Sequence, residues 1–377
     1  MTRLLGELVA RPSVYPPGAT ASVAKYIADT LRAVGYAVEV HSRLPGVDNV
    51  VARIGSGAPV VAFNCHIDTI APGGEWQTEP YVLTSTGAGR YAGLGAVNCK
   101  GSAATHLWLA AEVARAGGPA QGTLVFSFVG DEESLGPNGT KLLAELGAFV
   151  PDQLVVAAPT SNALMIEERG VLWARLVTTG RAVHAGDPSA GDNAIGRMTR
   201  LLAQLERFQA SQLAGRHEGS HHSTLSIGTI AGGANTNVVP AHCEATLDRR
   251  LLPSSETVTA AMAELEAVLA AAGEPAGSST LELVTGTNGF RMSPDQPLVR
   301  GFADAISGVT GRAAEIRVPI GASDARFLAA SGVQIVIFGP GDGHQGHAAN
   351  EAIDERELVE ACEIQYAVIR KSLGVKA

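Results

Sequence analysis

The sequence is poor in aromatic residues and has no long apolar run. Phe, Trp and Tyr together make up 5% of the 377 residues, so a core must be built mainly from Ala, Val, Leu and Ile. No apolar stretch approaches the ~20 residues that a membrane-spanning helix requires. The N-terminal segment also has no apolar region of the kind found in signal peptides. We therefore expect no membrane partner and a cytoplasmic location.

Clustered cysteines and clustered basic residues are missing as well. The four cysteines, Cys65, Cys99, Cys243 and Cys362, are scattered and show no Cys-x-x-Cys spacing. This argues against a disulfide framework and against a cysteine zinc site. The formal net charge is -9, and no run of like charges occurs. Because binding to nucleic-acid phosphates requires clustered Lys and Arg, we expect no nucleic-acid partner.

The length suits two domains, and much of the chain alternates between strand and helix patterns. Short β-branched apolar runs predict buried strands, and longer patterns between them predict helices. The predicted strands are Asn49–Ile54, Pro59–Phe63, Thr123–Val129, Leu154–Ala158 and Val333–Phe338, and the predicted helices are Thr20–Val34, Gly101–Gly117 and Thr140–Leu146. This alternation predicts an α/β domain with a largely parallel sheet, in which chemistry collects on loops at the carboxyl ends of the strands.

The middle of the chain has a different pattern, with more widely spaced strands. The predicted strands here are Leu172–Thr179, Thr224–Ile230 and Cys243–Leu252, and the predicted helices are Asp192–Arg207 and Glu256–Ala272. Two helices against an antiparallel sheet would form a compact α+β domain. After Thr285 the α/β pattern returns, with helices predicted over Leu298–Gly308 and Glu355–Leu373. We therefore predict an α/β domain of residues 1–171 and 286–377, with an α+β domain of residues 172–285 inserted into it.

Acidic residues and histidines lie on loops that follow three of the predicted strands. In His66-Ile67-Asp68, period-2 geometry places both polar side chains on one side of the chain, where the histidine can bind a metal and the carboxylate can hold its other ring nitrogen. In the adjacent pair Glu132 and Glu133, one carboxylate can act as general base while the other binds metal. His347 follows a glycine-rich turn. Taken singly, these are ordinary loop hydrogen bonds, an acidic turn and a surface histidine, but their convergence at one sheet edge favours a metal site.

In order and spacing, motifs across nearly the whole chain resemble those of the zinc amidohydrolases that include acetylornithine deacetylase, succinyl-diaminopimelate desuccinylase, aminoacylase and glutamate carboxypeptidase. The matching segments are His66-Ile67-Asp68-Thr69, Gly93–Gly101, Asp131-Glu132-Glu133, Ala158-Pro159-Thr160, His184, Gly191–Ala194, Asn237–Pro240, Asp248-Arg249-Arg250, Ser323-Asp324-Ala325, Gly339-Pro340-Gly341 and His347–Glu351. The resemblance implies a phosphorylase/hydrolase-like three-layer sandwich as catalytic domain, and an insert that acts as a lid and dimerisation domain. It also implies a hydrolase that acts on an amide bond of a small carboxylate-bearing substrate, such as an N-acyl amino acid or a dipeptide.

The resemblance assigns a role to each matching residue of the first domain. His66 matches a ligand of one zinc ion, and Asp68 matches the carboxylate that orients this histidine. Glu132 matches the general base that activates a water molecule. Glu133 and His347 match ligands of a second zinc ion.

In the insert, three residues match family positions that contact the substrate. His184 matches a lid histidine that stabilises the oxyanion, often across a dimer interface. Asn237 and Arg250 match lid residues that hold the substrate carboxylate. The resemblance therefore implies a homodimer formed through the lid.

Two positions depart from the family pattern. The family has an aspartate that bridges both metals where this chain has Asn98, and an acidic ligand where it has Ala158. Asn98 can offer a metal only a neutral amide oxygen and Ala158 offers no ligand, whereas catalytic zinc sites usually have three protein ligands. The site of His66 is then expected to be empty, and Glu133, His347 and the Asn98 oxygen remain as candidate ligands of one ion. The repulsion between two close dications would also be poorly compensated. We therefore predict one zinc ion at most, or none. Cys65 and Cys99 adjoin these loops, and we interpret them as small buried fillers rather than replacement ligands.

Three functions remain open at this point. The first is a hydrolase in which Glu132 delivers water to an amide carbonyl. The second is a repurposed scaffold that works without metal, in which Glu132 and His184 catalyse an acyl transfer, a cyclisation or an elimination. The third is a non-catalytic binding homologue. The sequence does not identify the acyl group of the substrate.

Overall fold

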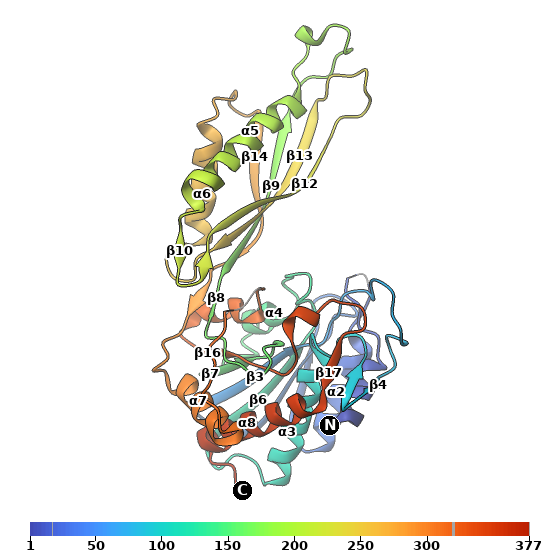
Figure 1. Ribbon diagram of the computed structural model, residues 1–377, viewed down its shortest axis with the longest axis vertical. Helices are drawn as coiled ribbons and strands as arrows, with labels where there is room; N and C mark the ends of the chain where they lie inside the picture. Colours follow the sequence, from blue (N-terminus) through green and yellow to red (C-terminus); the bar gives the residue numbers. More distant parts are fainter. Residues whose placement is uncertain (17, 319–320, 377) are drawn as a thin grey trace. The chain divides into compact units, whose positions relative to one another are not determined.

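The computed structural model describes residues 1–16, 18–318 and 321–376. The chain divides into two compact units, which are labelled by element in Figure 1. The first unit consists of Met1–Ile166, Met292–Arg317 and Ser323–Ala377, and the second of Glu167–Arg291 with the short piece Val318–Ala322. The predicted fold class, an α/β domain with an inserted α+β domain, is confirmed.

The first unit is built on a six-stranded sheet with the order β1-β2-β6-β3-β7-β16. Its strands are β1 (Ala37–His41), β2 (Asn49–Ser56), β3 (Val60–His66), β6 (Gly122–Val129), β7 (Gln153–Val156) and β16 (Gln334–Ile337). Strands β6, β3, β7 and β16 run parallel, whereas β1 and β2 form an antiparallel edge beside β6. The prediction of a largely parallel sheet therefore holds for four strands, and the whole sheet is mixed.

Helices of the first unit pack against this sheet. They are α1 (Thr2–Val9), α2 (Ala21–Ala33), α3 (Lys100–Arg115), α4 (Thr140–Glu145), α7 (Pro297–Thr310) and α8 (Glu355–Leu373). Helices α3 and α8 contact β3 and β6, and α7 contacts β16. Helix α8 begins where the Asp354 side chain accepts a hydrogen bond from the Arg356 amide, and it ends at Gly374, whose φ of 66° suits a residue without Cβ. Among the described residues, no helix is long and apolar enough to cross a membrane.

Smaller sheets occur in both units, a three-stranded one in the first and a two-stranded one in the second. Strands β4 (Thr84–Gly87), β5 (Arg90–Ala92) and β17 (Ala352–Asp354) form a three-stranded sheet, and β8 (Glu167–Glu168) pairs with β15 (Phe290–Arg291). Strand β17 brings the segment that follows His347 next to the segment that precedes Asn98.

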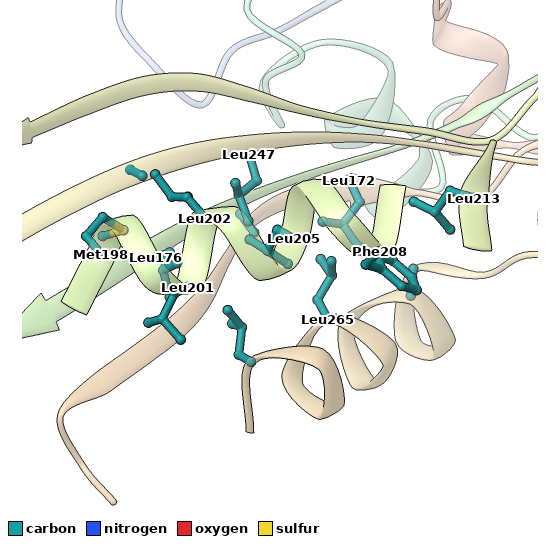
Figure 2. Packing of buried hydrophobic residues seen from close by; sticks show 14 of the residues in the cluster. Leu172, Leu176, Met198, Leu201, Leu202, Leu205, Phe208, Leu213, Leu247 and Leu265 are labelled. Atoms are coloured by element: carbon teal, nitrogen blue, oxygen red, sulfur yellow. The ribbon is translucent and has the colours of Figure 1, made fainter. Parts of the chain in front are cut away.

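The second unit is a four-stranded antiparallel sheet with two helices on one face (Figure 1). Its elements are β9 (Gly170–Thr179), α5 (Ala194–Phe208), β10 (His217–Glu218), β11 (His221–His222), β12 (Thr224–Gly232), β13 (His242–Leu251), α6 (Val258–Ala270) and β14 (Ser279–Thr287), with the sheet order β12-β13-β9-β14. Alternate residues of β9 and β13 are buried, as the period of two in a strand requires for a sheet with one covered face. Figure 2 shows this core, in which Leu176 and Leu247 of the sheet pack with Leu201 and Leu205 of α5 and with Leu265 of α6.

Candidate active site

Acidic and histidine side chains meet at the carboxyl ends of the parallel strands in the first unit. His66 is the last residue of β3, Glu132 and Glu133 follow β6, and His347 lies on the loop after β16. Ligand atoms of His66, Glu132 and Glu133 all lie within 4.8 Å of one another. His347 Nε2 is 2.9 Å from Glu133 Oε1. The structure thus brings together the three loops that the sequence analysis singled out.

His66 is held by the residue two positions further along. Its Nδ1 lies 3.1 Å from the backbone oxygen of Asp68 and 3.4 Å from Asp68 Oδ1. The other carboxylate oxygen of Asp68 accepts the backbone N–H of Glu133 at 3.0 Å, which ties the β3 loop to the β6 loop. Burial alone would lower the pKa of His66, but the hydrogen bond to Asp68 and the charges of Glu132, Asp68 and Glu133 raise this pKa to about 10. Without a bound metal, the imidazole is therefore protonated at neutral pH.

Glu132 lies in a largely buried position. Its side chain is 15% exposed, and the Arg326 guanidinium lies 3.6 Å away. Burial raises the pKa of Glu132 to about 7, although the positive charges of His66 and Arg326 oppose this rise. A base whose pKa lies near the working pH suits proton transfer, because both protonation states are accessible.

Asn98 faces Glu133, and its orientation is set by its own loop. Its amide Nδ2 donates a hydrogen bond to Glu133 Oε1, the same oxygen that pairs with His347. The buried carboxylate of Glu351 accepts the backbone N–H groups of Val97 at 3.0 Å and Asn98 at 3.1 Å, and also that of Gly95. The Glu351 carboxylate therefore anchors this loop.

Comparison with known proteins identifies the family. Residues 62–371 match the sequence profile of peptidase family M20/M25/M40. The chain belongs to this family. It is 30% identical over 366 residues to a succinyl-diaminopimelate desuccinylase of Bordetella parapertussis, with 94% of this chain and 93% of that protein covered. It is 33% identical over 343 residues to a desuccinylase of Methylorubrum extorquens, with 86% and 87% covered.

Solved structures agree on the fold. A tripeptidase from Staphylococcus aureus matches with a TM-score of 0.80 at 19% identity, over 99% of this chain and 98% of that chain. An M20 family metallo-carboxypeptidase from Sulfolobus solfataricus matches with a TM-score of 0.79 at 16% identity, over 98% of both chains. At these identities the structures establish the fold and not the substrate.

M20 enzymes are metal-dependent hydrolases that usually use zinc and typically bind two ions. Two of the carboxylate donors that the family resemblance implies for a pair of ions are absent from this chain. At the bridging position, Asn98 presents an N–H that donates to Glu133, so this group supplies neither negative charge nor a free oxygen on that side. Ala158, in the loop after β7, has no ligand atom. Glu133 and His347, whose Oε1 and Nε2 lie 2.9 Å apart, remain as donors for one ion, and a ligand atom of His66 lies within 4.8 Å of one of Glu133.

The predicted lid residues lie in the second unit. His184 is exposed, and its Nδ1 accepts the Gly186 N–H at 3.0 Å. Its loop is paired to the Asn237 loop by a hydrogen bond of 2.8 Å from the Ala185 N–H to the Asn237 carbonyl. The structure therefore brings His184 and Asn237 together.

Arg250, on β13, already has an acidic neighbour. Its Nε and Nη2 donate to the two oxygens of Asp248 at 2.7 and 2.9 Å. Asp248 also accepts the indole N–H of Trp173 at 2.8 Å. A substrate carboxylate that binds Arg250 must therefore use the N–H groups that Asp248 leaves free.

The sequence analysis did not assign a role to two charged residues of the first unit. Arg326 contacts Glu132, as described above, and Lys100 is fully buried with its Nζ donating to the Arg11 carbonyl at 3.0 Å. Burial lowers the pKa of Lys100 to about 8. Lys100 lies inside the matching segment Gly93–Gly101 and Arg326 directly follows Ser323-Asp324-Ala325, and these placements are their signal in the sequence.

Cys65 and Cys99 are both completely buried. The Cys65 thiol lies 3.4 Å from the Cys99 carbonyl, and the Cys99 thiol lies 3.4 Å from the Asp68 carbonyl. Burial raises the pKa of both thiols well above the usual value. Each thiol thus faces a backbone carbonyl in a fully buried position, as expected for a small buried filler.

Proposed function

We propose that this protein is an amidohydrolase that cleaves an amide bond in a small carboxylate-bearing substrate, an N-acyl amino acid or a dipeptide-like molecule. The observation that supports this best is the cluster of Glu132, His66 and Glu133 at the carboxyl ends of the parallel strands. The family membership and the names of its relatives point to the same class of reaction.

In this proposal Glu132 is the general base. It takes a proton from water while the water oxygen adds to the substrate carbonyl carbon, and it later gives that proton to the departing amide nitrogen. His66 uses Nδ1 to bind Asp68, so its protonated Nε2 is left to donate to the developing oxyanion. A single zinc ion held by Glu133 and His347 would supply Lewis acidity to the same carbonyl group, and His66 would remain free as the hydrogen-bond donor.

The second candidate is metal-independent chemistry on the same kind of substrate, such as an acyl transfer, a cyclisation or an elimination. A specific observation favours it: the Asn98 amide is hydrogen-bonded to Glu133 where the family has a bridging carboxylate. The two candidates differ in their products, because only hydrolysis incorporates an oxygen atom from water. A non-catalytic binding homologue would instead bind the same ligands without turnover.

The lid residues and the oligomeric state belong to the same proposal. We infer that His184 assists the oxyanion, that Asn237 and Arg250 hold the substrate carboxylate, and that the protein is a homodimer formed through the second unit. In support, β12 and β14 are the edge strands of its sheet, and they expose apolar side chains, including Ile230, Leu283 and Val284. Light scattering at micromolar concentration should give twice the chain mass, and a monomer would contradict the homodimer.

The experiment for the reaction uses protein purified without chelator. Its zinc content is measured, and it is incubated in ¹⁸O-labelled water with a panel of N-succinyl and N-acetyl amino acids and dipeptides. Hydrolysis predicts ¹⁸O in the released carboxylate. Glu132→Gln should lower kcat by about 10²–10⁴-fold, whereas Glu363→Gln, at an exposed position of α8, should not change it. A kcat of Glu132→Gln within threefold of the wild-type value would contradict the role of Glu132 as general base.

A further inference from the structure

Arg326 occupies an unusual position beside the proposed base. It lies in a short turn, Asp324–Phe327, and is 7% exposed. Its Nη1 donates to the Ser323 carbonyl at 2.7 Å and lies 3.6 Å from Glu132 Oε1. Its Nη2 lies 3.8 Å from Asp324 Oδ1, and the guanidinium carbon lies 4.5 Å from the Phe327 ring centroid. The guanidinium is thus buried between two carboxylates.

A chain of buried hydrogen bonds fixes the turn that presents Arg326. Asp324 Oδ2 accepts the Thr140 hydroxyl at 2.9 Å, and this hydroxyl accepts the Asn64 amide at 3.0 Å. Asn64 lies on β3, two residues before His66, and Thr140 begins α4. The position of Arg326 is therefore set by the same strand that presents His66.

Charge compensation gives Arg326 a specific task. In a two-zinc site, the metal ions offset the negative charge of the surrounding carboxylates, and this chain has lost donors for that pair. Among the described ion pairs, the Arg326 guanidinium is the permanent cation within 4.0 Å of Glu132. Because a buried carboxylate without a counter-ion is costly, a fixed cation beside it stabilises one placement of its oxygens. The protonated His66 is a second positive charge near Glu132, but it loses that charge when it binds a metal or gives up its proton, whereas Arg326 does not.

We propose that Arg326 is a positioning residue for Glu132. It attracts Oε1 of the carboxylate, which leaves Oε2 to take the proton of the nucleophile. Its Nη1 is bonded to the Ser323 carbonyl and its Nη2 faces Asp324 Oδ1 at 3.8 Å, so in this proposal Arg326 acts through Glu132 and not by contact with the substrate. This inference rests on the proposed function in one respect, the role of Glu132 as base.

The test compares Arg326→Met with Arg326→Lys, and uses Arg312→Met as the matched control, because Arg312 is exposed and pairs with Glu360 on the surface. On a substrate from the panel, Arg326→Met should lower kcat by about 10–100-fold with KM little changed, as for other residues that orient a catalytic group. Arg326→Lys, which keeps the charge, should lose less, and Arg312→Met should behave as wild type. In the Glu132→Gln background, Arg326→Met should cause no further loss.

Several outcomes would overturn the inference. These are a folded Arg326→Met with kcat within threefold of wild type, a loss confined to KM, or a full additional loss in the Glu132→Gln background. If Arg326→Met does not fold, the test uses Arg326→Lys instead. A decrease in kcat of Arg326→Lys as large as that of Glu132→Gln would refute the role of the positive charge. If wild type turns over no substrate, the proposed function fails separately. In that case the inference is tested by urea denaturation. If Arg326 and Glu132 are paired, Arg326→Met should destabilise the Glu132→Gln variant less than it destabilises wild type. Equal destabilisation of the two proteins would refute the pairing.

Discussion

In the Asn98→Asp variant, the group that faces Glu133 changes from an N–H donor to a carboxylate. Wild-type Asn98 donates a hydrogen bond to Glu133, whose side chain is 6% exposed. A hydrogen bond to a charged group contributes about 1.5–3 kcal/mol. The variant loses this bond and also adds a like-charge contact, which at ~4 Å costs about 4 kcal/mol at an effective dielectric constant of ~20. Sharing of a proton and pairing of Glu133 with His347 offset part of the repulsion.

We therefore expect metal-free Asn98→Asp to be less stable than wild type by about 2–4 kcal/mol. The measurement is urea denaturation with a chelator present, followed by a repeat with zinc. Asn98→Ala is the control, because it removes the hydrogen bond without adding charge and should lose less. Zinc at about 100 times its dissociation constant should restore about 2.7 kcal/mol to Asn98→Asp and much less to Asn98→Ala. If the free energy of unfolding of Asn98→Asp in chelator is within about 0.5 kcal/mol of the wild-type value, Asn98 does not donate a stabilising hydrogen bond to an ionised Glu133.

Three further predictions concern metal content, pH and the lid core. Elemental analysis of wild type should find at most one zinc per chain, and restoring both ligands in Asn98→Asp/Ala158→Glu should raise the content toward two; two well-occupied ions in wild type would contradict the reading of both positions. Burial lowers the pKa of His106 to about 3, so below its ordinary pKa of 6.5 the unfolded chain binds a proton that the folded chain does not. The free energy of unfolding should therefore decrease as the pH is lowered. Between about pH 7.5 and pH 5, wild type should lose about 2 kcal/mol more of it than His106→Phe in urea denaturation, and an equal loss in the two proteins would show that His106 is not buried in its neutral form. Leu201→Ala, in the core of the second unit, should cost about 2–5 kcal/mol of that unit's stability in calorimetry, and a cost under about 1 kcal/mol would mean that this core is loosely packed.

Features that depend on local pattern could be predicted from the sequence. The apolar runs of β3 and β6 predict buried strands, and because parallel strands end at one sheet edge, the meeting of His66 with Glu132 could be anticipated. Strand β1 was missed because most of its residues are half-buried or exposed, so it lacks the apolar run of a central strand.

Features that depend on tertiary contacts could not be predicted. Arg326 and Glu132 are far apart in the sequence, and no local pattern pairs them. The substitution at Asn98 could be read directly, but the direction of its amide could not, because that direction depends on the Glu351 anchor and on the position of Glu133. The roles of His184 and Arg250 remain predictions.

The Glu351 anchor bears on how such a protein can change over evolutionary time. A carboxylate of the chain itself holds the Gly95–Asn98 backbone, so this loop has an anchor that is separate from the ligand side chain at position 98. A substitution at position 98 can thus alter the chemistry of the site while the loop keeps its path. A chain that keeps Glu351 can therefore vary the side chain at position 98 while the backbone of that residue stays hydrogen-bonded.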